Sequence, residues 1–153
     1  MKKVLLLVLT LCLVVCMVGC SGGTDKLSTF YEKVSESQEL LDAVADDIYS
    51  NWHGAIYNDE FNEDIDLAIW SAQLDHSEDL ETIESLDGEI AELFKEVKED
   101  KENGALVKEI MSAYSAYYEF VVNVSGSFNS FSAEKETLKK ELASLLKELS
   151  YEL

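Results

Sequence analysis

The sequence of 153 residues contains no proline and no arginine, and its twelve lysines are set against 31 acidic side chains. A chain of this length ordinarily contains about seven prolines, so their absence favours long uninterrupted helices. The formal net charge of −19 excludes nucleic-acid binding, because phosphate backbones are bound by basic patches. The hydrophobic fraction of 47% is too high for a disordered acidic tail, and we therefore expect the chain to fold.

Residues that carry chemistry are also scarce. His53 and His76 are the only histidines, and neither completes the Glu-x-x-His spacing of di-iron bundles. The oxygen-bearing side chains between Asn58 and Asp66 lack the glycine and the glutamate of an EF-hand loop. A nucleophile elbow of the Gly-x-Ser-x-Gly type and a glycine-rich phosphate loop are both missing. We therefore expect no enzyme activity, no cofactor and no specific metal site, and at most weak binding of divalent cations at the surface.

The first residues have the layout of a secretory signal. Lys2 and Lys3 precede an apolar stretch from Val4 to Val18 that only Thr10 interrupts. Fifteen residues rise about 22 Å as a helix, which is short of the roughly 30 Å hydrocarbon core of a bilayer. A cleaved signal peptide of residues 1–19 is the prediction, and its removal would take the net charge from −19 to −21.

The end of this stretch, Met17-Val18-Gly19-Cys20, resembles the lipobox of bacterial lipoproteins, with Met17 in place of the usual leucine. The resemblance implies cleavage before Cys20, acylation of its thiol, and a lipid anchor on the extracytoplasmic face of the cell membrane. Residues 20–25 would then form a short tether. Cys12 lies with Cys16 in the removed segment, so the mature chain would have no disulfide. The alternative is an incidental cysteine after an ordinary signal or an uncleaved anchor.

Apolar residues then recur every three or four positions, which predicts amphipathic helices. The first helix is expected over 27–57. The second is expected over 62–99, capped by Asn62 and bent or briefly broken at Ser77 or at Gly88, because glycine costs about 1 kcal/mol inside a helix.

Two further helices are expected in the second half. One spans 106–124, after the turn at Asn103 and Gly104, and the last runs from a cap at Ser132 to about 152. Residues 26–153 are therefore predicted to form one all-α domain, an antiparallel up-and-down bundle of three long helices plus a shorter C-terminal one.

Two segments resemble an uncharacterised family of small helical proteins, often lipoproteins, from Firmicutes-type bacteria. Ser50–Tyr57 contains the Trp-x-x-x-Ile-Tyr element of that family, and Val124–Phe131 corresponds to its Pro-Ser-Gly-Ser-Leu element. Val124 and Phe128 stand where the family has proline and leucine. The resemblance implies a helical fold and a membrane location, and it assigns no activity.

Acidic and aromatic side chains indicate where partners could bind. Residues 59–102 carry 17 carboxylates and three lysines, which would repel anionic phospholipid and favour cationic or metal-bridged partners. Most aromatic residues are expected in the core, with Tyr118 and Phe120 as candidates for an exposed patch.

The predicted function is that of a non-enzymatic, membrane-anchored surface lipoprotein that binds a protein or another envelope component. One alternative is a lipoprotein that binds a small ligand or a divalent cation between its helices, near Trp52, His53 and Tyr57. Another is a phage-exclusion or immunity lipoprotein that blocks an envelope channel.

Overall fold

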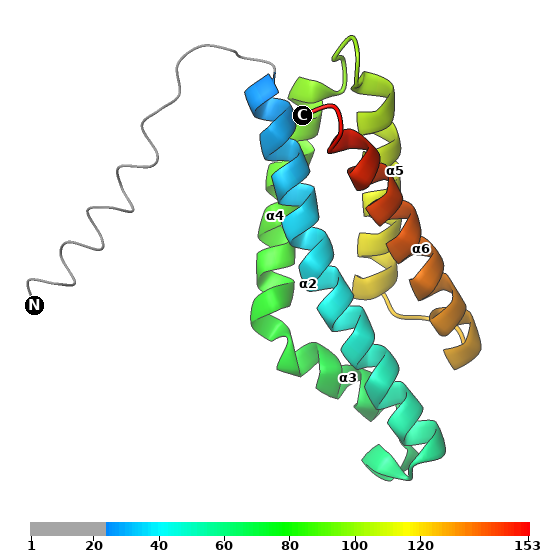
Figure 1. Ribbon diagram of the computed structural model, residues 1–153. Coiled ribbons are helices and arrows are strands. Elements are labelled where there is room, and N and C mark those ends of the chain that lie inside the picture. The colour runs from blue at the N-terminus through cyan, green and yellow to red at the C-terminus, as the bar shows by residue number, and fades with distance from the viewer. Residues whose placement is uncertain (1–23) are drawn as a thin grey trace, which may run out of the picture.

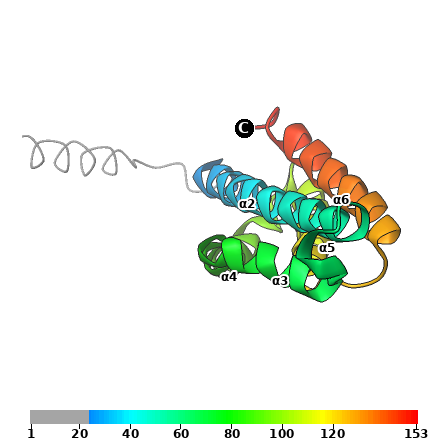
Figure 2. The same ribbon diagram turned by 90° about the horizontal axis from the view of Figure 1, so that it is seen from below.

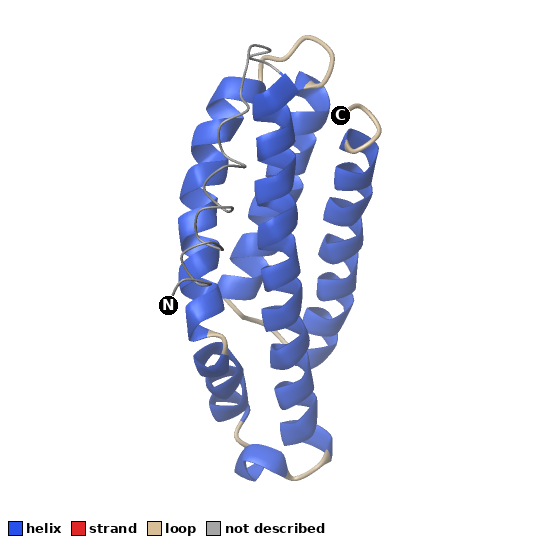
Figure 3. Cartoon of the chain, turned by 60° about the vertical axis from the view of Figure 1, so that its left-hand side comes forward, coloured by secondary structure: helices blue, strands red, loops and turns tan. Residues whose placement is uncertain are grey.

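The computed structural model describes residues 24–153, which form helices joined by short connections (Figures 1 and 3). In chain order these are α2 (Thr24–Tyr57), the 3₁₀ turn η1 (Glu60–Glu63), α3 (Ile65–Asp75), α4 (Ser77–Val97), α5 (Gly104–Val122) and α6 (Phe128–Leu149). In Figure 1, α2 runs downward, α3 and α4 return upward, α5 descends and α6 ascends. The predicted all-α, up-and-down bundle is confirmed, and residues 24–153 contain no strand.

The predicted signal peptide, Cys20 and the first part of the tether lie outside the described residues. Thr24 and Asp25, which we expected in the tether, are already the first residues of α2.

Helix α2 is the longest element and contacts every other helix of the bundle. It lies between α4 and α6 when the bundle is seen from below (Figure 2). Its 34 residues correspond to about 51 Å at 1.5 Å per residue. The predicted stripe on this helix is buried except at its last position, Ile56; the buried members are Leu27, Phe30, Val34, Leu41, Val44, Ile48 and Trp52. The helix is therefore the scaffold on which the other elements pack.

The second predicted helix is broken at one of the two expected places. His76 ends α3 and precedes α4, with φ −104° and ψ 25°. Helix α4 continues through Gly88, which faces solvent, and a Cβ added there would meet no heavy atom within 4 Å. The expected cap Asn62 is wrong: its φ is 54°, and the Asp64 side chain instead accepts the Leu67 amide at 3.0 Å.

The connection between α2 and α3 is unusual in its backbone. Asp59, Phe61, Asn62 and Glu63 all have positive φ, between 54° and 62°. This left-handed region costs about 1–2 kcal/mol for a residue other than glycine. The reversal of the chain at the far end of α2 is therefore strained.

The start and the length of the last helix differ from expectation. Helix α6 begins at Phe128, capped by Ser127, whose side chain accepts the Ser130 amide while the Ser130 hydroxyl accepts the Ser127 amide. The predicted cap at Ser132 is therefore wrong. With 22 residues, α6 is also longer than α5, which has 19, so the expected short C-terminal helix is not found. The earlier start lets Phe128 pack against the aromatic side chains at the end of α2.

Candidate functional site

The three predicted ligand residues lie at the end of α2 and face the start of α6. The His53 and Tyr57 rings are adjacent, with centroids 4.7 Å apart. Both rings also pack on Phe128, at 5.9 Å and 6.1 Å. Tyr57 is 61% exposed and His53 is half-buried, whereas Trp52 is only 4% exposed. The structure therefore brings His53 and Tyr57 together at the surface and places Trp52 in the core.

Trp52 packs between two phenylalanines of α6. Its ring centroid lies 6.0 Å from that of Phe128 and 5.5 Å from that of Phe131. Its indole Nε1 is buried and has no hydrogen-bond partner among the described residues. An unpaired buried donor costs about 1–3 kcal/mol, which offsets part of what the aromatic packing contributes. Trp52 thus joins α2 to α6 through apolar contact alone.

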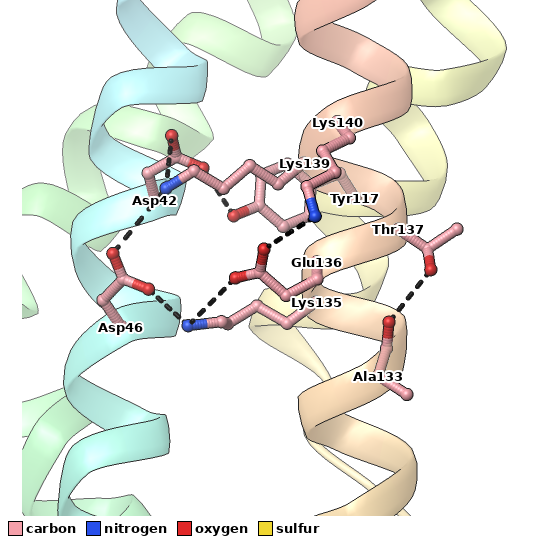
Figure 4. A network of polar contacts seen from close by, with 9 residues as sticks. All are labelled: Asp42, Asp46, Tyr117, Ala133, Lys135, Glu136, Thr137, Lys139 and Lys140. Carbon is pink, nitrogen blue, oxygen red and sulfur yellow. Dashed lines mark hydrogen bonds and ion pairs between the residues drawn. The ribbon is translucent and has the colours of Figure 1, made fainter.

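A polar network ties α2, α5 and α6 together in the middle of the bundle (Figure 4). Asp42 and Asp46 stand one turn apart on α2, and Lys135 and Lys139 stand one turn apart on α6. Lys139 Nζ lies 3.1 Å from Asp42 Oδ2 and 3.7 Å from Asp46 Oδ2. Tyr117 of α5 donates its hydroxyl to Asp42 Oδ1 at 2.7 Å. This network was not foreseen from the sequence, where its signal was the i, i+4 spacing of the two acids and of the two lysines.

Lys135 is the most buried charged residue of the network, with 7% exposure. Its ammonium donates to Asp46 Oδ1 and lies 4.6 Å from the centroid of the Tyr49 ring. A cation over an aromatic face gains about 0.5–2 kcal/mol, depending on how far it is desolvated. Asp46 itself is largely exposed, so the pair sits at the edge of the core and not inside it.

Electrostatics in this network favour a protonated tyrosine and a charged lysine. Burial raises the pKa of the Tyr117 phenol, and the neighbouring Asp42 and Asp46 carboxylates raise it further. Burial lowers the pKa of Lys139, but Asp42 and Asp46 outweigh that effect and leave it above the ordinary value. These groups therefore keep one charge state near neutral pH, which suits a structural role.

A second polar cluster joins α2, α4 and α5. Ser37 Oγ and Tyr114 Oη are both buried and lie 3.2 Å apart, within hydrogen-bond distance. Burial raises the pKa of Tyr114, and the nearby Asp87 raises it further. Burial also raises the pKa of the Asp87 carboxyl, although the Tyr114 hydroxyl opposes this shift. Burial therefore disfavours the ionised form of Asp87 in this cluster.

His76 occupies the joint between α3 and α4. Its Nδ1 lies 2.7 Å from Asp79 Oδ2, and its Nε2 lies 3.4 Å from Asp47 Oδ2 on α2. The imidazole thus lies between a carboxylate of α4, to which it is hydrogen-bonded, and a carboxylate of α2. In residues 24–153 no group of three or more potential ligands is arranged to hold a metal ion.

The exposed apolar surface does not lie at Tyr118 and Phe120, where the sequence analysis placed it. Tyr118 and Phe120 are partly buried against the core, and Phe120 stacks on Phe131 at 4.6 Å. Large exposed apolar side chains concentrate instead near the end of α2 and on α3: Ile56, Tyr57, Ile65, Leu67, Trp70 and Leu74. The hypothesis of an exposed patch at Tyr118 and Phe120 is therefore wrong.

Three of these residues form one surface, which we name the α3 outer face: Leu67, Trp70 and Leu74. They follow the i, i+3, i+7 spacing that places side chains along one side of a helix. Ala68 and Ala72, on the opposite side, are fully buried. Helix α3 is apolar on both sides, and the side that packs inward is the one through Ile69 and Ala72, whose three- and four-residue spacing continues into α4.

The surroundings of the α3 outer face are strongly acidic. The carboxylates nearest in sequence are Asp59, Glu60, Glu63, Asp64, Asp66, Asp75, Glu78 and Asp79. Between Lys33 and Lys95 the chain contains no lysine. In the described part of the chain, the lysine ion pairs join none of the carboxylates from Asp59 to Asp87. The α3 outer face is therefore an apolar stripe on a segment of the chain that is rich in carboxylates without a lysine partner.

Comparison with family models, with curated proteins and with solved structures found no match for this chain. The resemblance to small helical lipoproteins stays a prediction. Within residues 24–153, no helix combines the length and apolarity that crossing a bilayer requires.

Proposed function

We propose that the chain is a non-enzymatic surface lipoprotein, anchored through Cys20 on the extracytoplasmic face of the cell membrane, whose bundle binds a protein partner. The α3 outer face is the observation that carries this proposal. Monomeric soluble domains rarely leave neighbouring large apolar side chains in water unless another molecule covers them. Trp70 and Leu74 are each more than half exposed.

The position of this face relative to the expected anchor supports the proposal. Helix α2 begins at Thr24, four residues after Cys20, and α3 packs against the opposite end of α2 (Figure 1). At about 51 Å, α2 is longer than a bilayer's hydrocarbon core is thick. A bundle standing on its tether would therefore present the α3 outer face well away from the membrane surface, where an envelope or extracellular protein can reach it.

The polar clusters support a binding role and not a catalytic one. Tyr117 and Lys139 bind Asp42, and His76 is hydrogen-bonded to Asp79 with Asp47 of α2 on its other side. Each of these side chains joins two helices, which accounts for its position without a substrate. The α3 outer face is apolar, and apolar contact contributes binding energy without chemistry.

Metabolic labelling with palmitate tests the anchor. The wild-type chain and the control Cys16→Ala are expected to incorporate label and to sediment with membranes, because Cys16 lies in the removed segment. Cys20→Ala is expected to lose the label. An unlabelled wild type, or label retained by Cys20→Ala, contradicts the lipid anchor.

Capture from detergent-solubilised membranes tests the binding. The tagged wild-type protein is expected to retain a specific protein that the variant Trp70→Gln does not retain. The control variant Tyr151→Gln, at an exposed tyrosine of the other end of the bundle, is expected to retain the same protein. Identical recovery with Trp70→Gln contradicts a role for the α3 outer face.

A further inference from the structure

The α3 outer face is an exposed apolar stripe of the kind that packs against the apolar side of another helix. Leu67, Trp70 and Leu74 are 38%, 57% and 53% exposed and point away from α2. Amphipathic helices bind partners through anchors spaced at i, i+3, i+4 and i+7. Tryptophan is enriched among the residues that contribute most of the binding energy. The stripe thus offers one tryptophan flanked by a leucine about one turn away on either side.

The backbone of α3 is held in place before any partner arrives. Asp64 caps its first turn, and Asn51 of α2 donates its side-chain amide to the Ala68 carbonyl at 3.4 Å. At the other end, His76 joins the helix to Asp79 and to Asp47. A helix fixed at both ends loses little conformational freedom on binding, and this favours affinity.

The charge around the stripe selects among possible occupants. A second copy of the chain would bring the same uncompensated carboxylates against each other, and like charges across an interface cost several kcal/mol. An anionic lipid surface is repelled for the same reason. The carboxylates from Asp59 to Asp79, which we name the acidic rim, would pair with lysine or arginine. A segment with apolar side chains flanked by these basic residues would therefore cover the stripe and pair with the acidic rim.

We propose that the α3 outer face binds a cationic amphipathic protein segment, in which apolar side chains cover Leu67, Trp70 and Leu74 and flanking basic side chains pair with the acids around α3. This inference rests on the proposed function for the location of the partner, but the recognition chemistry belongs to the bundle alone. The acidic rim would speed association and make it sensitive to salt, while the apolar stripe would hold the complex.

Titration with two synthetic peptides tests this proposal. One is an 18-residue amphipathic helix of leucine and lysine, and the other has glutamate at every lysine position. Fluorescently labelled peptide is titrated with the purified mature protein in phosphatidylcholine vesicles, and the anisotropy above that given by the same vesicles without protein reports binding. The lysine peptide is expected to bind, at least tenfold more weakly in 0.5 M than in 0.1 M salt, and the glutamate peptide is expected not to bind.

Variants then assign the site. The triple variant Leu67→Gln, Trp70→Gln, Leu74→Gln keeps every charge and is expected to weaken binding of the lysine peptide at least tenfold. The matched control is Tyr151→Gln with Leu153→Gln, two exposed apolar residues of the C-terminal end, and it is expected to bind as the wild type does. Circular dichroism and urea unfolding verify that both variants are folded, and the single variant Trp70→Gln serves if the triple variant is not.

Several outcomes overturn the proposal. Unchanged binding by the triple variant would mean that the lysine peptide follows negative charge alone. Binding of the glutamate peptide would exclude the acidic rim as a selector. A dimer seen by light scattering and lost in the triple variant would make a second copy the occupant. Palmitate labelling is independent of these results. A missing lipid anchor would refute the proposed membrane location, but it would not affect the proposal that the α3 outer face binds a cationic amphipathic segment.

Discussion

Replacing Tyr117 with phenylalanine removes one hydroxyl from the centre of the network in Figure 4 and leaves the buried ring in place. That hydroxyl donates to Asp42 Oδ1 at 2.7 Å. A hydrogen bond to a charged group contributes about 1.5–3 kcal/mol to stability. Asp42 keeps Lys139 Nζ at 3.1 Å and retains some contact with water, so the lower part of that range applies. We expect Tyr117→Phe to lower the free energy of unfolding by about 1.5–2 kcal/mol.

Urea unfolding at pH 7, followed by far-ultraviolet circular dichroism, measures this difference. Tyr118→Phe is the matched control, because the Tyr118 hydroxyl bonds to no other described residue, and we expect a change below about 0.5 kcal/mol. A double-mutant cycle of Tyr117→Phe with Asp42→Asn is expected to give a coupling of about 1 kcal/mol, since the two side chains are in contact.

The pH dependence offers an independent test. Burial raises the pKa of Tyr117 above its ordinary value of 10.0, so the unfolded chain releases this proton at a lower pH than the folded chain does. The contribution of Tyr117 to stability is therefore complete below pH 10 and declines as the pH rises further. Phenylalanine cannot ionise, and the gap between wild type and Tyr117→Phe should narrow above pH 10. Equal stability at pH 7, or a gap that widens at alkaline pH, would refute the reasoning.

Three further substitutions test the packing and the charges. Gly88→Ala should raise the free energy of unfolding by about 1 kcal/mol in urea titrations, because the position is helical and open to solvent; a loss of stability would contradict a continuous α4. Gly104→Ala should lower it, since the new Cβ would lie 2.7 Å from the Lys98 carbonyl oxygen, and an unchanged midpoint would refute that close approach. Burial raises the pKa of Asp87, so its ionised form at pH 7 costs folding free energy that Asp87→Asn should recover. Below pH 3.8 the carboxyl is protonated in both the folded and the unfolded chain, and the substitution should have no effect. An equal effect at both pH values would exclude burial of that charge as the cause.

The amino-acid pattern was sufficient for the class of fold. Stripes with helical spacing identified the four helical segments. The predicted stripe of α2 is buried as far as Trp52, and Ser37 and Ala45 are buried beside it. The break before α4 was also foreseeable from the acids at Glu78 and Asp79, which suit the positive end of a helix. Whether the helix breaks at Gly88 could not be decided from the sequence. A glycine costs a helix only about 1 kcal/mol, which is less than the free energy gained by burying Ile83, Leu86 and Ile90.

The start of α6 depended on contacts that lie far apart in the sequence. Ser127 and Ser132 are both good caps by composition, but only the earlier start carries Phe128 and Phe131 onto Trp52. Local propensity differs little between two serines, whereas the aromatic packing favours one of them.

The candidate site was foreseen only in part. His53 and Tyr57 do lie together, but the exposed apolar surface of Leu67, Trp70 and Leu74 was not predicted. Helix α3 carries apolar residues on two sides. The side through Ile69 and Ala72 follows the predicted stripe and packs inward, and Ala68 is buried beside it, so the second apolar side is left in solvent. Small side chains allow a close approach of two helices, which hydrophobicity alone does not reveal.

Photo-crosslinking in living cells tests most directly whether the α3 outer face of the anchored protein binds a basic partner. Trp70→p-benzoylphenylalanine places a photoreactive ring on this face in the full chain, and Ser85→p-benzoylphenylalanine provides an exposed control on α4. Irradiation is expected to produce one discrete adduct from position 70 in the membrane fraction, with a protein whose linked segment is rich in lysine or arginine. No adduct above that from position 85, or an adduct with a second copy of this chain, would contradict the account.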